Sequence, residues 1–366
     1  MSEVSEMILN FGPQHPSTHG VLRIKVKLDG EIVREAVPIL GYLHRAQEKI
    51  AENRTYMEYL PLTDRLDYVS SMTGNHAYSL AVEELLDVEV PRRADFIRVI
   101  VSEFQRIASH CLWLSAFGLD IGAITPLFYA FREREYIMDL FEAVCGARLT
   151  YSYIVPGGVR YDLPENFIES ARKIIKLIRP KIDEYEDLLA EAGVFLMRTK
   201  GVGVIKPEDA INLGITGPIL RGCGVEADLR KMEPYSVYDE IDFEVQTWDG
   251  CDVFSTYKVR MNEMRESLNI IEQALDMLPK NGKIKAKLPR ILKPPAGDAY
   301  GRVESPRGEL GFYVVSDGTE RPYRVRIRSP AFINISAIPF MVKDTIIADF
   351  IAILGVIDVV MGEADK

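Results

Sequence analysis

The chain has only five histidines, and two of them fall in one short segment that could present imidazole groups to a ligand. His15 and His19 lie in residues 10–20, NFGPQHPSTHG, where two prolines and two glycines predict a shaped loop and not a helix. A loop that leads directly into a sheet is a suitable place for a hydrogen-bonding imidazole. The plainer interpretation is that Ser17, Thr18 and the histidines tie down an N-terminal turn, and the residues alone favour it.

A second segment with titratable side chains is DRLDYVSSM, residues 64–72. It places Arg65, Asp67 and Tyr68 at the start of a stretch with helical spacing. Tyrosine donates a hydrogen bond through its phenol, and arginine carries a permanent charge. The plainer interpretation is a helix cap formed by Asp64, followed by a surface charge pair.

A third segment, GLDIGA at residues 118–123, lodges Asp120 among apolar residues. A carboxylate buried there needs a partner, because an unpaired buried charge is costly. The alternative is a helix C-terminal turn with glycines and one solvated aspartate. Taken alone, the three segments support only an α+β protein with no assigned chemistry.

The elements that must position these residues are mostly helical. Residues 21–37 alternate between apolar and polar side chains around Asp29-Gly30, which predicts a β-hairpin. Apolar residues recur at helical spacing from Ile97 to Cys111. Similar spacing predicts further helices over residues 64–86, 126–146, 165–192, 261–277 and 343–361.

The pattern as a whole predicts an α+β fold, in which a central helical bundle carries small attached β-sheets. No linker is visible, so we expect one domain over residues 1–366. Its expected parts are an N-terminal loop and hairpin, a helical core, a mixed strand and loop region with a helix near 261–277, and a C-terminal helix and tail: 1–42, 43–200, 201–340 and 341–366.

Composition excludes several classes of protein. The net charge of −10 disfavours nucleic-acid binding, because phosphate neutralisation needs a basic surface. The N-terminal residues lack the pattern of a signal peptide. Asp349 and Asp358 interrupt the most apolar stretch, 345–361, so we expect a buried helix there and not a membrane span. Widely spaced cysteines without a CxxC pair predict reduced thiols: Cys111, Cys145, Cys223 and Cys251.

Several motifs together resemble one family, the 49-kDa-type subunit of complex I and its bacterial and archaeal relatives. The motifs are GPQHPSTHGVLR, DRLDYVSSM, YSLAVEELL, VPGGVRYDLP, LRGCG, PYSVYDE, SPRGELGFYVVSDG and DVVMGEADK. They run in the same order from about Ile8 to Lys366, and many motifs in register are far more specific than one short pattern. The resemblance implies a fold like that of nickel–iron hydrogenase large subunits, without the nickel–iron site.

The resemblance also implies site residues. The quinone-headgroup ligands of the family correspond to His19 and Tyr68, the carboxylate that pairs with the histidine corresponds to Asp120, and Arg65 corresponds to an arginine near the partner's iron–sulfur cluster. This assignment makes chemical sense, because a reduced quinone oxygen needs hydrogen-bond donors and then protons. Histidine titrates near neutral pH, and a carboxylate behind it favours the protonated ring.

The function implied is the quinone-site subunit of a membrane-associated, proton-pumping dehydrogenase of the complex I type. The expected partners are a small iron–sulfur subunit and further peripheral-arm and membrane-arm subunits, on the cytoplasmic side of a bacterial or archaeal membrane. No cofactor is expected on this chain alone. The substrate is a quinone or a phenazine, and the electron donor stays open between NADH, a deazaflavin coenzyme and ferredoxin.

Two departures from the family pattern bear on the acceptor. The family's histidine after GARM is Thr150 in this sequence, within GARLT, and the HRG-x-E segment reads HRAQE at residues 44–48. Because threonine does not titrate at physiological pH, the first departure predicts a partner cluster whose potential is low and nearly independent of pH. That would suit a low-potential acceptor such as menaquinone or a phenazine.

Two alternatives remain. In related energy-converting hydrogenases, two Cys-x-x-Cys pairs hold the metals, and these positions correspond to Asp67, Ser70, Val360 and Glu363. Soft metals in such sites need thiolates, so hydrogenase activity is disfavoured. The other alternative is a non-catalytic scaffold subunit, which the joint presence of His19, Tyr68 and Asp120 argues against.

Overall fold

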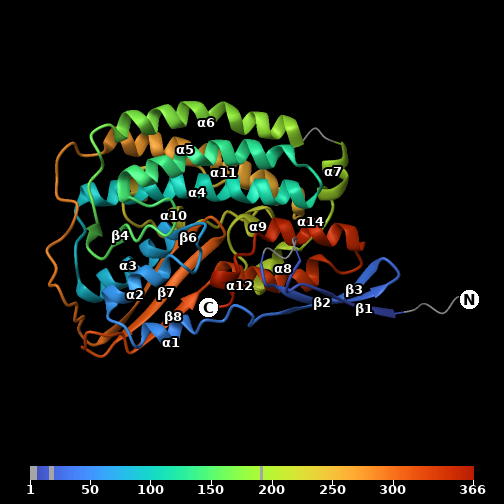
Figure 1. Cartoon of the computed structure of the whole chain (residues 1–366), viewed down its shortest axis with the longest axis horizontal. Helices are drawn as coiled ribbons and strands as arrows, with labels where there is room; N and C mark the ends of the chain where they lie inside the picture. Colours follow the sequence, from blue (N-terminus) through green and yellow to red (C-terminus); the bar gives the residue numbers. More distant parts are fainter. Residues whose placement is uncertain (1–5, 16–19, 190–192) are drawn as a thin grey trace, which may run out of the picture.

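The computed structural model describes residues 6–15, 20–189 and 193–366 of the chain. Four long helices lie side by side and form one layer, below which the sheets and shorter helices gather (Figure 1). The four helices are α4 (Arg92–Asp120), α5 (Thr125–Cys145), α6 (Phe167–Leu189) and α11 (Val253–Met277).

Helix α4 is the centre of this layer. It contacts α5 and α11 along its length, and further contacts reach α3 (Ser71–Leu86) and α14 (Ile347–Ile357). It is therefore buried on most of its faces, as its apolar residues at helical spacing predict. By contrast, α6 buries one stripe of apolar residues and turns charged residues outward. A helix with periodic apolar residues can therefore be buried on most sides, as α4 is, or on one side only, as α6 is.

The N-terminal sheet contains the predicted hairpin. β2 (Arg23–Asp29) pairs antiparallel with β3 (Ile32–Ile39), and Gly30 takes the positive φ of 61° that the tight turn needs. An additional strand that the pattern did not predict, β1 (Glu6–Phe11), pairs with β2. The sheet buries alternate residues of β2 against the C-terminal segments, since β3 contacts α13 (Ile338–Met341).

The second sheet packs against α3. Its strands run antiparallel in the order β6 (Gly297–Ser305), β7 (Gly308–Ser316) and β8 (Arg324–Arg328). A Cβ added to Gly301 would lie 2.3 Å from the backbone nitrogen of Ala81, so only glycine allows the strand to approach α3 this closely. A hydrophobic cluster fills the space between this sheet and helices α2 (Tyr56–Thr63) and α3.

The other elements are short. They connect the layers or cap their ends, and they are α1 (Gln47–Ala51), β4 (Ile154–Val155), β5 (Gly158–Val159), α7 (Gly193–Thr199), α8 (Pro207–Asn212), α9 (Pro218–Arg221), α10 (Leu229–Met232), a 3-10 helix η2 (Tyr238–Glu240), α12 (Pro330–Asn334), a 3-10 helix η3 (Ile335–Ala337) and α15 (Met361–Ala364). Among the described residues, no helix is both long and apolar enough to cross a bilayer.

The α+β fold class is confirmed, and so is the combination of a helical bundle with small sheets. The prediction of one domain stays a prediction. Several helix boundaries were wrong. The helix predicted over 261–277 begins earlier, at Val253, where Asp252 caps it by accepting from the N–H of Ser255. The helix predicted over 64–86 begins only at Ser71, because residues 64–70 form tight turns that the carboxylate of Asp67 stabilises. The helix predicted over 343–361 ends at Ile357, because Asp358 adopts the left-handed conformation, with φ 57°.

Candidate functional site

Tyr68 lies on the turn between α2 and α3 and reaches the surface. Asp67 accepts hydrogen bonds from the backbone N–H groups of Val69 and Ser70, both at 3.1 Å, and so fixes the turn that directs the next side chain outward. Tyr68 is 37% exposed, and its hydroxyl makes no hydrogen bond within the described part of the chain. Partial burial, aided by the charge of Asp67, raises the pKa of Tyr68. The phenol therefore keeps its proton at neutral pH and is available to donate it.

The loop that carries His19 is anchored on both sides, although His19 itself lies outside the described residues. Before the loop, the ring of His15 packs on Phe11 at 5.2 Å, and Phe11 packs on Phe350 of α14 at 4.8 Å. After the loop, a Cβ added to Gly20 would lie 3.5 Å from the side chain of Met361. Both ends of the loop therefore rest on the C-terminal segment.

Asp120 reaches the same segment from the far end of α4. A Cβ added to Gly355 of α14 would lie 3.2 Å from its carboxylate oxygen Oδ2, and the indole N–H of Trp113 donates to the carbonyl of Gly355 at 3.0 Å. Asp120 is partly buried. The close approach of α4 and α14 depends on the missing side chain at Gly355.

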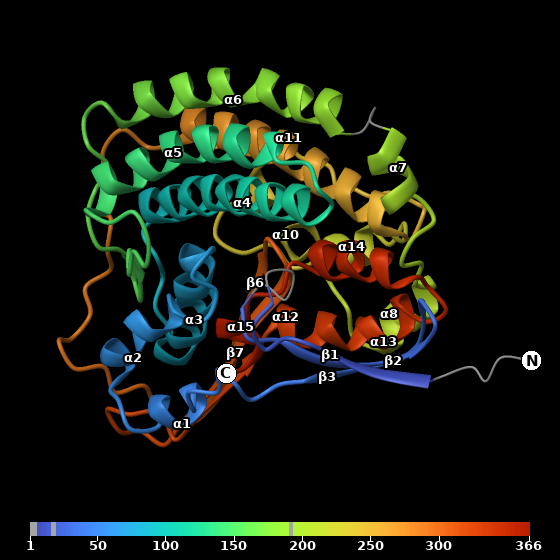
Figure 2. The same cartoon turned by 45° about the vertical axis from the view of Figure 1, so that its right-hand side comes forward.

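The C-terminal segment joins these parts, because Gly362 packs directly against Tyr68. A Cβ added to Gly362 would lie 2.5 Å from the carbonyl oxygen of Leu66 and 3.2 Å from the ring of Tyr68. Arg45 bridges the two segments, since its Nη2 donates to the carbonyls of Arg65 at 2.8 Å and Gly362 at 2.9 Å. Figure 2 shows α14 between the long helices and the N-terminal sheet, so all three predicted site segments border one C-terminal stretch.

Arg65 and Thr150 lie on two segments that are side by side, and the segment of Arg65 also carries Tyr68. The side chain of Arg65 is 44% exposed and donates to the carbonyl of Pro61 at 2.6 Å. The adjacent Asp64 is fully buried and accepts hydrogen bonds from the N–H of Ser152 at 2.9 Å and from its hydroxyl at 2.5 Å. Burial raises the pKa of Asp64 to about 6. The segment that carries Thr150, whose φ is 54°, is thereby held beside Arg65.

A group of buried ions lies directly behind Tyr68, and we call Asp67, Arg307, Asp358 and Glu363 the site cluster. Arg307 donates to Asp67 at 2.7 Å and to Asp358 at 3.2 Å. Glu363 accepts from the N–H of Ala331 at 3.1 Å, but its other oxygen is buried without a hydrogen-bond partner in the described residues. Burial, together with the charge of Asp67, raises the pKa of Glu363 to about 8. Two of the four positions that correspond to hydrogenase thiolates, Asp67 and Glu363, thus hold carboxyl groups, and Glu363 keeps a proton at neutral pH.

A second group of buried ions lies deeper, and we call it the core cluster: Glu103, Arg106, Arg221, Asp228, Arg230, Glu263 and Glu304. Arg221 donates to Glu263 at 2.6 Å and to Glu304 at 2.7 Å. Arg230 similarly joins Asp228 to Glu103. Within the described residues, every carboxylate of this cluster therefore has a guanidinium partner.

Arg260 and His110 connect the two clusters. Arg260 donates to Asp358 at 3.0 Å and approaches Nδ1 of His110 at 3.4 Å, while Nε2 of His110 bonds Glu263 at 2.8 Å. Burial lowers the pKa of His110 to about 4 and holds that of His76 well below its usual range. Burial therefore favours the neutral form of both imidazoles.

Sequence reasoning missed Arg307 and the proton-holding role of Glu363. Both lie in quoted motifs, SPRGELGFYVVSDG and DVVMGEADK, but neither received a role. The available signal was charge in apolar surroundings, as in the C-terminal stretch that contains Asp358. That signal shows that a partner is needed, but it does not say which residue supplies it.

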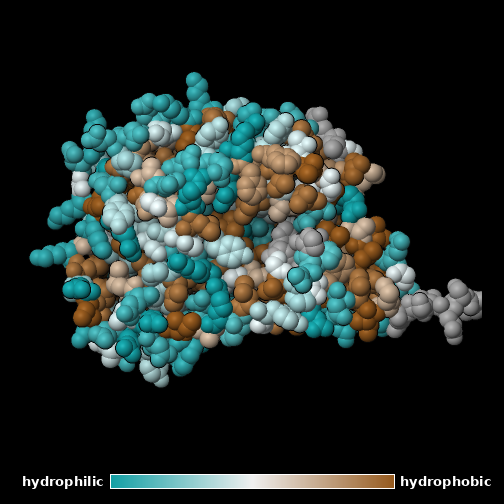
Figure 3. Space-filling model, viewed as in Figure 1, coloured by the Kyte–Doolittle hydropathy of each residue, from teal (hydrophilic) through white to brown (hydrophobic). Residues whose placement is uncertain are grey.

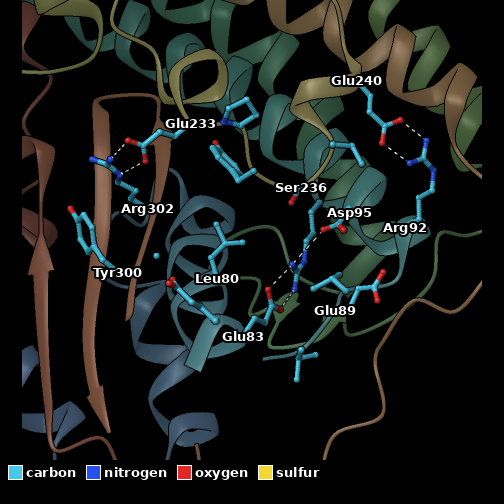
Figure 4. A pocket seen from close by; sticks show the side chains of 18 residues that line it. Leu80, Glu83, Glu89, Arg92, Asp95, Glu233, Ser236, Glu240, Tyr300 and Arg302 are labelled. Carbon is cyan, nitrogen blue, oxygen red and sulfur yellow. Dashed lines mark hydrogen bonds and ion pairs between the residues drawn. The ribbon is translucent and has the colours of Figure 1, made fainter. Parts of the chain in front are cut away.

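One well-formed cavity lies apart from the predicted site residues. It measures about 680 Å³ and lies between α3, the start of α4, the segment around Tyr235 and β6, and none of the predicted site residues lines it. Four ion pairs border it (Figure 4): Arg98 with Glu83 and with Asp95, Arg92 with Glu240, and Arg302 with Glu233. Such a strongly charged lining does not suit a neutral, largely apolar quinone ring.

Comparisons with known proteins cover the whole chain. The family model described as "Respiratory-chain NADH dehydrogenase, 49 Kd subunit" matches residues 120–296 and 288–366. A protein of Dehalococcoides mccartyi, named as a subunit of NADH-quinone oxidoreductase, is 52% identical over 365 residues, which is 100% of this chain and 99% of that protein. Its namesake in Bacillus mycoides is 49% identical over 365 residues and 100% of both chains. A protein of Solibacter usitatus, named for the same enzyme, is 50% identical over 362 residues, 99% of this chain and 98% of that protein.

Proposed function

The chain belongs to the family of the 49 kDa subunit of respiratory-chain NADH dehydrogenase, and we propose that it forms, with an iron–sulfur partner subunit, the pocket where a quinone-type acceptor is reduced. Its relatives are subunits of NADH-quinone oxidoreductases, so the chain is a subunit of an oxidoreductase complex. Tyr68 carries the proposal. Its phenol is partly exposed and has no hydrogen bond among the described residues. It lies against Gly362, and the neighbouring Met361 contacts Gly20 at the end of the loop that carries His19.

The chemistry follows from the needs of the acceptor. Reduction of a quinone to a quinol adds two electrons and two protons across its two carbonyl oxygens. In the proposal, the hydroxyl of Tyr68 and a ring nitrogen of His19 donate to one carbonyl oxygen and stabilise the negative charge that develops there. Asp120 favours the protonated form of His19. An iron–sulfur cluster of the partner would supply the electrons, with Arg65 beside it at the rim.

An apolar surface next to Asp120 supports a partner subunit. Leu119, Ile124 and Phe128, around the junction of α4 and α5, are 50%, 55% and 64% exposed. Figure 3 shows hydrophobic surface over this end of the long helices. Apolar patches of this kind on one face mark interaction sites. We assign this surface to the iron–sulfur partner, and the wider assembly to a peripheral arm on the cytoplasmic side of a proton-translocating membrane complex.

Substitution of Tyr68 tests the function. Tyr68→Phe removes a hydroxyl that makes no hydrogen bond within the described residues, so the complex should assemble normally. Acceptor reduction should fall on the order of 100-fold, the usual contribution of a positioned proton donor. Tyr323→Phe is the matched control, because Tyr323 is 69% exposed and far from the site segments in sequence. If Tyr68→Phe turns over at an unchanged rate, or if the complex fails to assemble, Tyr68 is not a proton donor to the acceptor.

The partner surface has its own test. Phe128→Asp places a charge in the apolar patch and should prevent incorporation of the chain into the complex, because an unpaired charge buried in an interface is costly. Met232→Asp is the control, since Met232 on α10 is 62% exposed and outside the patch. Expressed without partners, the unsubstituted chain should be poorly soluble or oligomeric. Equal incorporation of both variants would refute the assignment.

A further inference from the structure

Two of the four cysteines, distant in the sequence, lie side by side in the fold. Cys223 follows α9, and Cys251 precedes α11. Two backbone hydrogen bonds bring their segments together, from the N–H of Trp248 to the carbonyl of Arg221 and from the N–H of Cys251 to the carbonyl of Gly222, both at 2.9 Å. The backbone of Cys251 is thus bonded to the residue next to Cys223, which holds the two cysteines on adjacent segments.

The side chains also meet. The thiol of Cys223 points to the carbonyl of Ile205 at 3.5 Å, and the N–H of Ile205 donates to the carbonyl of Cys251 at 3.1 Å, so both cysteines border the same residue. The thiol of Cys251 points to the carbonyl of Asp249 at 4.0 Å, and neither cysteine is part of a disulfide in this structure. Cys111 and Cys145 lack such an arrangement, because Cys111 is isolated in α4 and Cys145 bonds the carbonyls of Phe141 and Ala147.

We propose that Cys223 and Cys251 form a reversible dithiol–disulfide pair that reacts with peroxides, a site separate from acceptor reduction. Cys251 is partly exposed and Cys223 is buried, so the oxidant reaches Cys251 first. The Cys251 thiolate attacks hydrogen peroxide, which gives a sulfenic acid and hydroxide. The Cys223 sulfur then displaces hydroxide from this sulfenic acid, so that the S–S bond forms and water leaves. Overall, two thiols and one peroxide give one disulfide and two waters.

The two cysteines differ in burial and in reactivity toward peroxide, as a reacting thiol and a resolving thiol must. Burial and the neighbouring thiol raise the pKa of Cys223, which keeps it protonated and unreactive toward peroxide by itself. Its proximity to Cys251 makes it a resolving thiol, which prevents further oxidation of the sulfenic acid. The resulting bond would join the end of α9 to the start of α11 and close residues 224–250 into a loop. Arg221 of the core cluster lies two residues before the bridge.

Thiol counting on the assembled complex tests the proposal. Brief treatment with hydrogen peroxide, followed by denaturation and alkylation, should remove two of the four alkylatable thiols of this chain. Trypsin should then release residues 222–230 joined to residues 232–258, and dithiothreitol should separate them. Cys145→Ser should lose the same two thiols as the unsubstituted chain. Cys223→Ser should form no internal link and should accumulate sulfinic acid at Cys251.

Other outcomes would overturn the pair. An unchanged thiol count would show that the site does not react, and a link between two chains would show that the reaction is intermolecular. Irreversible oxidation of Cys251 at the same rate with and without Cys223 would show that Cys223 does not resolve the sulfenic acid. A higher melting temperature of this chain after oxidation, absent in Cys223→Ser, is the expected second readout, because the bridge restricts the unfolded chain.

Discussion

The site cluster and the core cluster both bury charged side chains in the interior, yet their carboxylates are in different states. In the core cluster, guanidinium contacts outweigh burial and lower the pKa of Glu103 to about 2 and that of Asp228 to about 2. The exception is Glu304, whose pKa is raised by burial and by the nearby Asp228. In the site cluster, Glu363 has no guanidinium hydrogen bond among the described residues, and its pKa rises to about 8.

The difference shows what decides the state of a buried carboxylate in this fold. Desolvation acts on both clusters and always favours the neutral acid. A bidentate arginine, such as Arg230 on Asp228, reverses that preference, whereas a single backbone N–H, such as that of Ala331 on Glu363, does not. Apart from Glu304, the carboxylates of the core cluster are therefore ions that hold the helices together, while Glu363 of the site cluster keeps a proton close to Tyr68.

Removal of the central arginine should have the largest effect. Arg221→Met leaves Glu263 and Glu304 buried without their guanidinium, and breaking such a pair costs about 3–5 kcal/mol of folding free energy. The chain should not accumulate in the complex. Arg172→Met is the control, because Arg172 pairs with Asp276 on the surface and should change stability by less than about 0.5 kcal/mol. Normal amounts of the Arg221 variant would contradict the structural role of the core cluster.

The protonated state of Glu363 is the next prediction. From pH 4.5 to about 8, the folded chain keeps a proton on Glu363 that the unfolded chain has lost, so stability falls as pH rises through this window. Each pH unit costs at most about 1.4 kcal/mol. Glu363→Gln has no such titration and should gain stability relative to the unsubstituted chain as pH rises.

Infrared difference spectra of the complex provide the direct measurement for Glu363. The carbonyl band of a buried carboxylic acid should be present at neutral pH, disappear near pH 8 and be absent from Glu363→Gln at all pH values. Glu233→Gln is the control, because Glu233 is an exposed partner of Arg302. If Glu363 is ionised at pH 6, the prediction is wrong, and Glu363 behaves like the arginine-paired carboxylates of the core cluster.

A smaller effect is expected from Asp67→Asn. The negative charge of Asp67 raises the pKa of Glu363. Neutralising Asp67 should therefore lower the pKa of Glu363 and shift its infrared titration to lower pH. Arg307 loses one charged partner but keeps Asp358 and the hydroxyl of Ser109, so the cost should be about 1–3 kcal/mol. If the titration of Glu363 does not move, repulsion from Asp67 is not a cause of the shift.

The smallest change in stability is expected at Thr150. Its φ of 54° is unfavourable for a β-branched residue and better tolerated by histidine, so Thr150→His should change folding by less than about 1 kcal/mol. If this segment faces the partner's cluster, the imidazole should make the cluster potential depend on pH, with a slope approaching about 59 mV per pH unit. Thr150→Ser should leave the potential flat. A steep slope in the unsubstituted complex would show that another group titrates there.

Local patterns in the sequence determined the larger elements, whereas the site residues were predicted only from the resemblance to a family. The Asp29-Gly30 turn predicted the first hairpin. Helical spacing predicted α4, α5, α6 and α11, although their first and last residues were not predicted accurately. These features depend on neighbours a few residues apart, so the sequence contains them directly. Motif order also pointed to Tyr68 and Asp120, which the structure places along one C-terminal stretch.

Only the tertiary structure decided the partners of those residues. Arg307 meets Asp67 across 240 positions, and Gly362 packs on Tyr68 from the other end of the chain. A backbone hydrogen bond joins Cys251 to Gly222, the residue next to Cys223. No periodicity records such contacts, because they form only when the layers pack. Whether a buried carboxylate is an ion or an acid depends on the one or two groups within hydrogen-bonding distance. The sequence thus shows where charges lie, and the packing of the elements sets their chemical state.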